Sequence, residues 1–174
     1  MTKIKKIIPI KNGKVEIVYS NGNIYKGYVN INKLFNGYGQ YYIKERNIVI
    51  SGYFNDSHIH YGQIIYYNTK NIYKGEILFF KAHGRGVLVS PNGEVFDGYF
   101  IDNKINGYGF YYTNNNKFYG YWYRGRLYKN FNKFKKYRKS VENSPSKPLE
   151  ILEEKSFHNN LMLLSNVAIR IGYI

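Results

Sequence analysis

A glycine recurs along this chain every 22–25 residues, each time inside the same short pattern, and this repeat restricts the possible folds more than any other feature. The pattern has an aromatic or apolar residue two positions before the glycine and an apolar residue two positions after it. Its five copies are Tyr25-Lys-Gly27-Tyr-Val29, Ile50-Ser-Gly52-Tyr-Phe54, Tyr73-Lys-Gly75-Glu-Ile77, Phe96-Asp-Gly98-Tyr-Phe100 and Phe118-Tyr-Gly120-Tyr-Trp122. A fixed period of roughly 20–50 residues indicates a chain built from repeated supersecondary units.

Each repeat is predicted to form two short strands. Side chains alternate around the first glycine, so Tyr25 and Val29 share one face of a strand while Tyr28 lies on the other. A second glycine signature then opens the next strand: Asn36-Gly37-Tyr-Gly39, His60-Tyr-Gly62, His83-Gly84-Arg-Gly86 and Asn106-Gly107-Tyr-Gly109. We expect a loop of about eight residues between the two strands and Asn-Gly turns, such as Asn21-Gly22, between units.

The resulting prediction is an all-β fold, an elongated single-layer antiparallel β-meander of about five hairpin repeats over residues 13–128. Residues 1–12 are expected to lead into it. Lys14–Tyr19 is predicted to be the second strand of a degenerate first unit, since terminal repeats are often atypical.

The repeated glycines are interpreted as structural. No GxGxxG pattern is followed by a helix and no Gly-Lys-Ser/Thr occurs, so phosphate cradling is not indicated. A glycine in a strand lets an aromatic ring lie flat on the backbone, and a glycine pair allows positive φ at a bend. We therefore expect each repeat to form a glycine groove filled by a Tyr or Phe of the same or the next unit. The structural glycines are Gly27, Gly37, Gly39, Gly52, Gly62, Gly75, Gly84, Gly86, Gly98, Gly107, Gly109 and Gly120.

This pattern resembles the MORN (membrane occupation and recognition nexus) repeat family, whose units join an aromatic-x-Gly-x-aromatic strand to a His/Asn-Gly-x-Gly strand. The chain departs from the motif at His60, which replaces a glycine, and at Glu76-Ile77, which replaces an aromatic. The resemblance implies a non-enzymatic scaffold or adaptor. It also implies action at membranes or the cytoskeleton, and we expect a cytoplasmic protein, at the membrane periphery or on the cytoskeleton.

The remainder of the chain differs in composition. Residues 129–148 are predicted to be a basic linker with Pro and Ser, and residues 149–174 a helical, apolar segment. Since a single-layer sheet cannot hide both faces, this segment is expected to fold back onto the sheet. The alternatives are that it mimics a partner helix, or that two copies dimerise through the open sheet edge.

The formal net charge of +15 suggests binding to an anionic partner as an alternative function. Residues 129–140 hold six basic and no acidic residues, interleaved with aromatics, which suits peripheral binding to anionic lipids. The candidate lipid contacts are Lys133, Lys135, Lys136, Arg138 and Lys139. Nucleic acid is a less favoured partner because no RNP-type or helix-turn-helix motif occurs.

Catalysis finds little support, and a cryptic hydrolase is the least favoured alternative. The acidic residues of the repeats are scattered, and no Ser stands in a GxSxG turn. His58 and His60 would share a strand face, but two histidines without a third ligand are weak evidence for a metal. We therefore predict no catalytic residues, no metal and no cofactor. The chain has no Cys, so disulfides and Cys-ligated metals are excluded.

The favoured function is binding of a protein partner, a helix or a peptide, on an aromatic sheet face. Tyr and Trp give large contact area at low entropy cost. The candidate contacts are Tyr28, Tyr53, Tyr99 and Tyr121, with Trp122 as an anchor. The alternative is that these rings only pack on the sheet.

Overall fold

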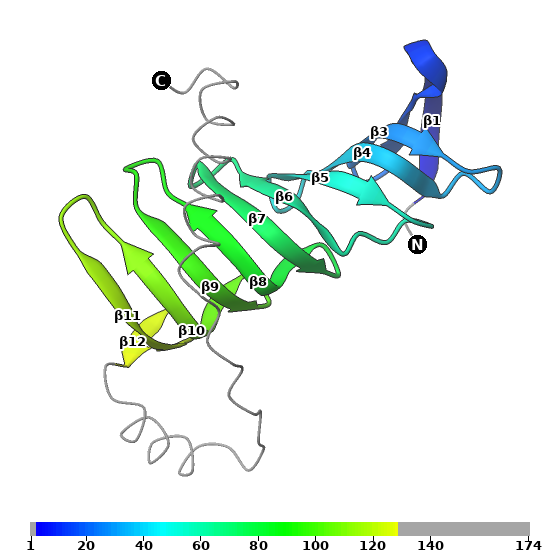
Figure 1. Cartoon of the computed structure of the whole chain (residues 1–174). Helices are drawn as coiled ribbons and strands as arrows, with labels where there is room; N and C mark the ends of the chain where they lie inside the picture. Colours follow the sequence, from blue (N-terminus) through cyan, green and yellow to red (C-terminus); the bar gives the residue numbers. More distant parts are fainter. Residues whose placement is uncertain (1–2, 129–174) are drawn as a thin grey trace.

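The fold is one open, twisted antiparallel sheet of twelve strands in chain order, seen in the computed structural model, which describes residues 3–128 (Figure 1). A short 3-10 turn, η1 (Lys11–Gly13), is the only helical element of that part. The strands are β1 (Ile4–Pro9), β2 (Val15–Tyr19), β3 (Ile24–Val29), β4 (Phe35–Ile43), β5 (Ile48–Phe54), β6 (Tyr61–Tyr66), β7 (Asn71–Leu78), β8 (Lys81–Val89), β9 (Val95–Ile101), β10 (Lys104–Tyr112), β11 (Lys117–Tyr123) and β12 (Arg126–Tyr128). The predicted all-β antiparallel meander is confirmed.

Two of the expected boundaries differ in the structure. The residues expected to lead into the repeats form β1, which pairs with β2. The loop of about eight residues expected within each unit is too long for most units: β7 and β8 are joined by Phe79-Phe80 alone, and β9 and β10 by Asp102-Asn103. The second strand begins earlier because it continues through its first glycine as a bulge. Gly37, Gly84 and Gly107 have φ values of 95°, 59° and 121°, and each lies where the pairing register shifts.

Nine glycines form one row across the sheet, perpendicular to the strands. Each is the direct pairing partner of the next, from β3 to β11. The row is Gly27, Gly39, Gly52, Gly62, Gly75, Gly86, Gly98, Gly109 and Gly120. Since pairing partners point to the same side of a sheet, this glycine row removes side chains along a line on one face.

Large side chains lie in the groove that the glycine row leaves, on the side we call the core face. A Cβ on Gly27 would come within 2.5 Å of the Tyr25 hydroxyl, and Tyr73 covers Gly75 and Gly86 in the same way. Phe96 covers Gly98 and Gly109. The interpretation of the glycines as a groove for Tyr and Phe is thus confirmed in three units.

Aliphatic side chains fill the groove in the other two units. In the second unit the position of the ring is taken by Ile50, and the longer β5–β6 connection folds Ile59 over Gly52 and Gly62 instead. In the fifth, Leu127 of β12 lies over Gly120.

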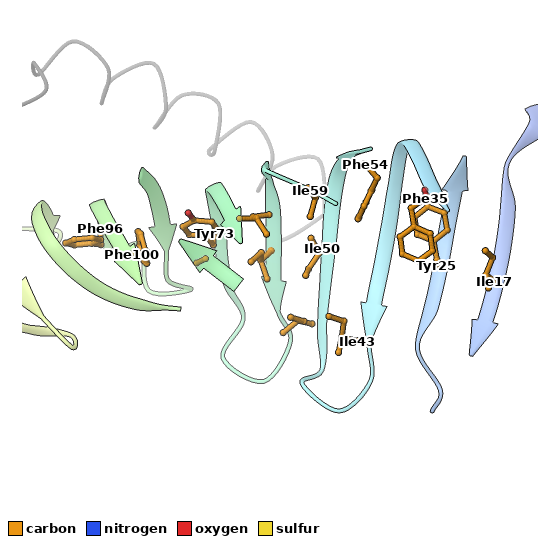
Figure 2. Close-up of a cluster of buried hydrophobic side chains, with 14 of the residues drawn as sticks. Ile17, Tyr25, Phe35, Ile43, Ile50, Phe54, Ile59, Tyr73, Phe96 and Phe100 are labelled. Carbon is orange, nitrogen blue, oxygen red and sulfur yellow. The ribbon is translucent and has the colours of Figure 1, made fainter. Parts of the chain in front are cut away.

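The core face carries one continuous apolar cluster that extends along the sheet (Figure 2). Its rings contact one another within and across units: Tyr25 stacks on Phe35 of the same unit with centroids 3.6 Å apart, and Phe54 of the next unit meets both edge-on. Tyr73 meets Phe100 edge-on at 4.9 Å. Apolar burial and ring contacts between neighbouring units therefore hold the meander together, as in other repeat architectures.

Within residues 3–128, no helix is long and apolar enough to cross a membrane. The predicted linker 129–148 and the predicted helical segment 149–174 lie outside the described residues.

Candidate functional site

The face opposite the core face, which we call the outer face, carries a row of tyrosines beside the glycine row. Every strand from β3 to β11 contributes one residue to this row. It is the residue directly after the row glycine on odd-numbered strands and the residue directly before it on even-numbered strands. Seven of the nine are tyrosine: Tyr28, Tyr38, Tyr53, Tyr61, Tyr99, Tyr108 and Tyr121. The other two are Glu76 and Arg85. Tyr38 pairs directly with Tyr53, and Tyr108 pairs directly with Tyr121.

Exposure is greatest at the N-terminal end of the tyrosine row. On four successive strands, Tyr28, Tyr38, Tyr53 and Tyr61 are 37%, 45%, 75% and 55% exposed. The Tyr38 and Tyr53 rings meet edge-on with centroids 5.4 Å apart, and the Lys14 ammonium lies 5.4 Å from the centre of the Tyr28 ring. These rings are held by their neighbours while much of their surface faces solvent.

Bulge glycines make room for tyrosines of this row. A Cβ on Gly107 would lie 2.9 Å from the Tyr99 Cβ, and one on Gly37 would lie 3.3 Å from the Tyr28 Cβ. The prediction that paired glycines allow positive φ at a bend is confirmed. The first glycine of each pair serves the outer face and the second serves the core face.

Charged residues interrupt the tyrosine row at its centre. Glu76 accepts a hydrogen bond from the Arg85 main-chain N–H at 2.8 Å, and the Arg85 guanidinium pairs with Asp97 at 2.5 Å. These residues line a shallow hollow of about 250 Å³ together with Tyr61, Lys74, Gly86 and Val87. Burial raises the pKa of Asp97, while the charge of Arg85 acts to lower it. The ion pair fixes the guanidinium, whose centre lies 5.6 Å from that of the Tyr99 ring.

The predicted contact residues divide between the two faces. Tyr28, Tyr53, Tyr99 and Tyr121 all lie in the tyrosine row. Trp122 does not: it is 8% exposed on the core face, packed edge-on against Phe96 at 5.4 Å and against Tyr111 at 5.6 Å. Trp122 therefore does not lie beside these tyrosines, where it was expected to anchor a partner, because adjacent residues of a strand point to opposite faces.

Three tyrosines of the row were absent from the predicted set, namely Tyr38, Tyr61 and Tyr108. Their signal was present in the sequence, since each directly precedes the row glycine on the second strand of its unit: Gly39, Gly62 or Gly109. That position shares a face with the residue directly after the row glycine of the first strand, because the two row glycines of a unit are pairing partners.

His58 and His60, the two histidines considered as a metal pair, lie in different surroundings. His58 Nδ1 lies 2.9 Å from the main-chain oxygen of Asp56, which ties it to its own turn, and His60 is exposed. In the part of the chain that the structure describes, no group of three His, Cys, Asp or Glu side chains could hold a metal ion. The candidate lipid contacts, Lys133 to Lys139, lie outside the described residues.

Comparisons with known proteins give only distant structural likenesses. No family model matches the chain, and no curated protein matches it. The crystal structure of the TCP10c domain of Drosophila melanogaster Sas-4 is similar with a TM-score of 0.41 and 15% identity, over 67% of this chain and 70% of that one. The Drosophila SAS-4 TCP domain in complex with a proline-rich motif of Ana2 gives 0.43 and 15%, over 67% and 71%. At these TM-scores we draw no conclusion about function.

Proposed function

We propose that this protein is a non-enzymatic scaffold or adaptor that binds a protein partner on the tyrosine row of its outer face. The observation that carries the proposal is the run of exposed tyrosines on four successive strands, Tyr28, Tyr38, Tyr53 and Tyr61. Contiguous exposed aromatic surface on a folded chain marks an interaction site more often than single exposed residues do.

The chemistry of the row suits a protein ligand. Tyrosine offers a wide apolar ring with a polar end and loses little side-chain entropy when it is covered. Neighbouring strands lie about 4.8 Å apart, so the row from β3 to β11 runs for roughly 38 Å. An extended peptide of about twelve residues or a helix of about 25 residues would span it.

The MORN resemblance agrees with this proposal and remains a prediction, as does action in the cytoplasm at the membrane periphery or the cytoskeleton. The place of action would follow from the identity of the partner.

The test is quantitative affinity capture from cells that express the protein natively. The full-length chain, the double variant Tyr38→Ser/Tyr53→Ser and the control Tyr67→Ser are compared by mass spectrometry. Tyr67 is a matched control because it is 48% exposed but lies in the β6–β7 turn, away from the row. We expect the wild type and the control to retain the same partner and the double variant to lose it. Equal recovery by all three would refute the proposal.

A further inference from the structure

The turn between β7 and β8 has an unusual sequence for its backbone. Phe79 and Phe80 both adopt left-handed φ values, 49° and 59°. The equivalent turns of the next two units use Asp102-Asn103 and Arg124-Gly125 in the same region. Two-residue hairpin turns with two positive φ values strongly favour Asn, Asp and Gly. A bulky aromatic residue in that region is strained, and such strain concentrates at functional sites.

Packing explains only one of the two phenylalanines. The Phe80 ring packs against the core cluster and contacts Tyr41 with centroids 5.4 Å apart. The Phe79 ring is 79% exposed at the tip of the hairpin. Packing in the core cluster of the described residues, which does not include Phe79, therefore does not account for this strained and exposed aromatic residue.

Further apolar surface lies on the outer face at the same end of the sheet as the Phe79-Phe80 turn. Leu78 is 39% exposed and Ile101 is 45% exposed, and they follow two residues after the tyrosine-row positions of β7 and β9. The β9–β10 turn holds these strands together at this end, because the Asn103 N–H donates to the Ala82 carbonyl at 2.9 Å and the Asn103 side chain accepts from the Ala82 N–H at 2.8 Å.

Basic side chains flank this apolar surface. Lys81 pairs with Leu78 across the hairpin, and Lys104 pairs with Ile101, so both lysines are on the outer face. Asp102 is the acidic residue beside them, and it forms an ion pair with Lys81 at 3.3 Å. We call Leu78, Phe79, Lys81, Ile101 and Lys104 the Phe79 patch. Its positive balance has the sign of the whole chain, whose formal net charge is +15.

We infer that the Phe79 patch is the docking site for a protein segment in which apolar side chains alternate with carboxylates, with the Phe79 ring as the anchor. The inference rests on the proposed function, since the patch continues the outer face beyond the tyrosine row, and it names the chemistry of the partner. Exposed aromatic anchors surrounded by weaker contacts dominate binding energy at interfaces. Because Lys81 is already paired with Asp102, it is charge complementarity with Lys104 that selects an acidic segment and speeds its association.

The first experiment selects binders from a displayed library of random peptides on the full-length chain. The affinity of an enriched peptide is then measured for the wild type, Phe79→Asn, Lys104→Glu, Tyr38→Ser/Tyr53→Ser and the control Tyr67→Ser. We expect enriched peptides to carry aliphatic or aromatic residues beside Asp or Glu. Phe79→Asn should weaken their binding by about tenfold or more, and Lys104→Glu should weaken it in a salt-dependent way. Tyr67→Ser should bind as the wild type does.

Thermal unfolding gives a second readout, which distinguishes a binding role of Phe79 from a purely structural one. Asn suits the left-handed conformation, so Phe79→Asn should raise the melting temperature by about 2–5 °C while it weakens binding. Phe80→Asn removes a core contact and should lower the melting temperature. A lower melting temperature for Phe79→Asn would show that the ring packs inside the protein and would overturn the inference.

The other outcomes separate this inference from the proposed function. If peptide binding depends on Tyr38 and Tyr53 but not on Phe79, the tyrosine row stands and the patch is refuted; if it depends on neither, both fail. Selection of basic or uncharged peptides, or of none, overturns the inference. So does Phe79-dependent retention by vesicles of phosphatidylcholine and phosphatidylserine without peptide binding, because the patch would then insert into lipid.

Discussion

Substituting alanine at Gly86 tests whether the glycine row exists to seat aromatic rings. Gly86 lies in the interior of the row, next to its central Gly75. Its backbone φ is outside the left-handed region, so any cost of the substitution is steric. The Cβ of alanine would lie 2.5 Å from Cζ of Tyr73 and closer still to the Tyr73 hydroxyl. The usual separation for such a contact is 3.4–4 Å, so the ring or the strand must move by about an ångström.

Tyr73 has little freedom to move. Its side chain is fully buried, and its hydroxyl donates to the Glu76 carbonyl at 2.7 Å, with the His83 carbonyl 3.1 Å away. Expelling a buried aromatic ring costs about 3–5 kcal/mol, and its hydrogen bond about 1 kcal/mol more. Partial relaxation, and the preference of a strand for Ala over Gly of about 0.5–1 kcal/mol, reduce the sum. We expect Gly86→Ala to lower the free energy of unfolding by about 2–4 kcal/mol.

The assay is urea unfolding of the full-length chain. Far-ultraviolet circular dichroism follows the whole sheet, and the fluorescence of Trp122, the single tryptophan, follows its C-terminal end. Gly13→Ala is a contrasting substitution whose cost has a different cause: Gly13 has φ of 73° and no neighbour within 4 Å of an added Cβ. Its substitution isolates the left-handed backbone cost of about 1–2 kcal/mol without a clash.

A double-mutant cycle decides the mechanism. In a Tyr73→Ala background the ring is gone, so Gly86→Ala should cost nothing or be slightly stabilising. The coupling between the two substitutions should therefore be about 2–4 kcal/mol. If Gly86→Ala costs less than about 1 kcal/mol, or costs the same with and without the Tyr73 ring, the glycine row does not seat the rings and the explanation is wrong.

Three further predictions concern buried polar groups. Tyr73→Phe removes the hydroxyl that donates a partly buried hydrogen bond to the Glu76 carbonyl. It should cost about 1–2 kcal/mol in urea unfolding, and an unchanged midpoint would contradict this. Burial raises the pKa of Tyr25 to about 12 from 10.0, so stability present below pH 10.0 should fall as the pH rises toward about 12. Following tyrosinate absorbance with unfolding should show ionisation only with loss of structure, and free titration of Tyr25 in the folded state would oppose it. Burial also raises the pKa of Asp97 above 3.8, so the folded state takes up the proton at a higher pH than the unfolded state does. This group therefore adds stability as the pH falls through the raised pKa toward 3.8. Asp97→Asn should remove this contribution, and identical pH dependence of the stability of the two proteins would contradict it.

The sequence was sufficient for the architecture because the repeat signal is local. Glycine spacing, alternation around Gly27 and the turn residues between units predict hairpins, and the structure has them. The strand ends were less predictable, because a glycine such as Gly84 is compatible both with a bulge within a strand and with a loop between two strands. The Phe79-Phe80 turn was hidden for the opposite reason: its residues disfavour the conformation they adopt.

The groove fillers show where local reasoning fails. An aromatic residue two positions before the glycine predicted the ring over Gly27, Gly75 and Gly98. The second unit has Ile50 there, and the groove is filled by Ile59 from a connection whose path depends on tertiary packing. Register across strands was equally necessary to find Tyr38 and its equivalents as members of the tyrosine row.

Tyr25 and Tyr28 show why the number of aromatic residues cannot identify a binding face in this protein. They lie three residues apart on β3, yet Tyr25 is fully buried and Tyr28 is 37% exposed. The Tyr25 hydroxyl even donates to the Tyr28 carbonyl at 2.8 Å. The difference is parity relative to the row glycine: a ring two positions away fills the groove, and a ring one position away lies on the outer face. Because parity separates the two roles, a substitution at an adjacent position such as Tyr53 can change binding while it leaves the groove intact, and one at Tyr73 cannot.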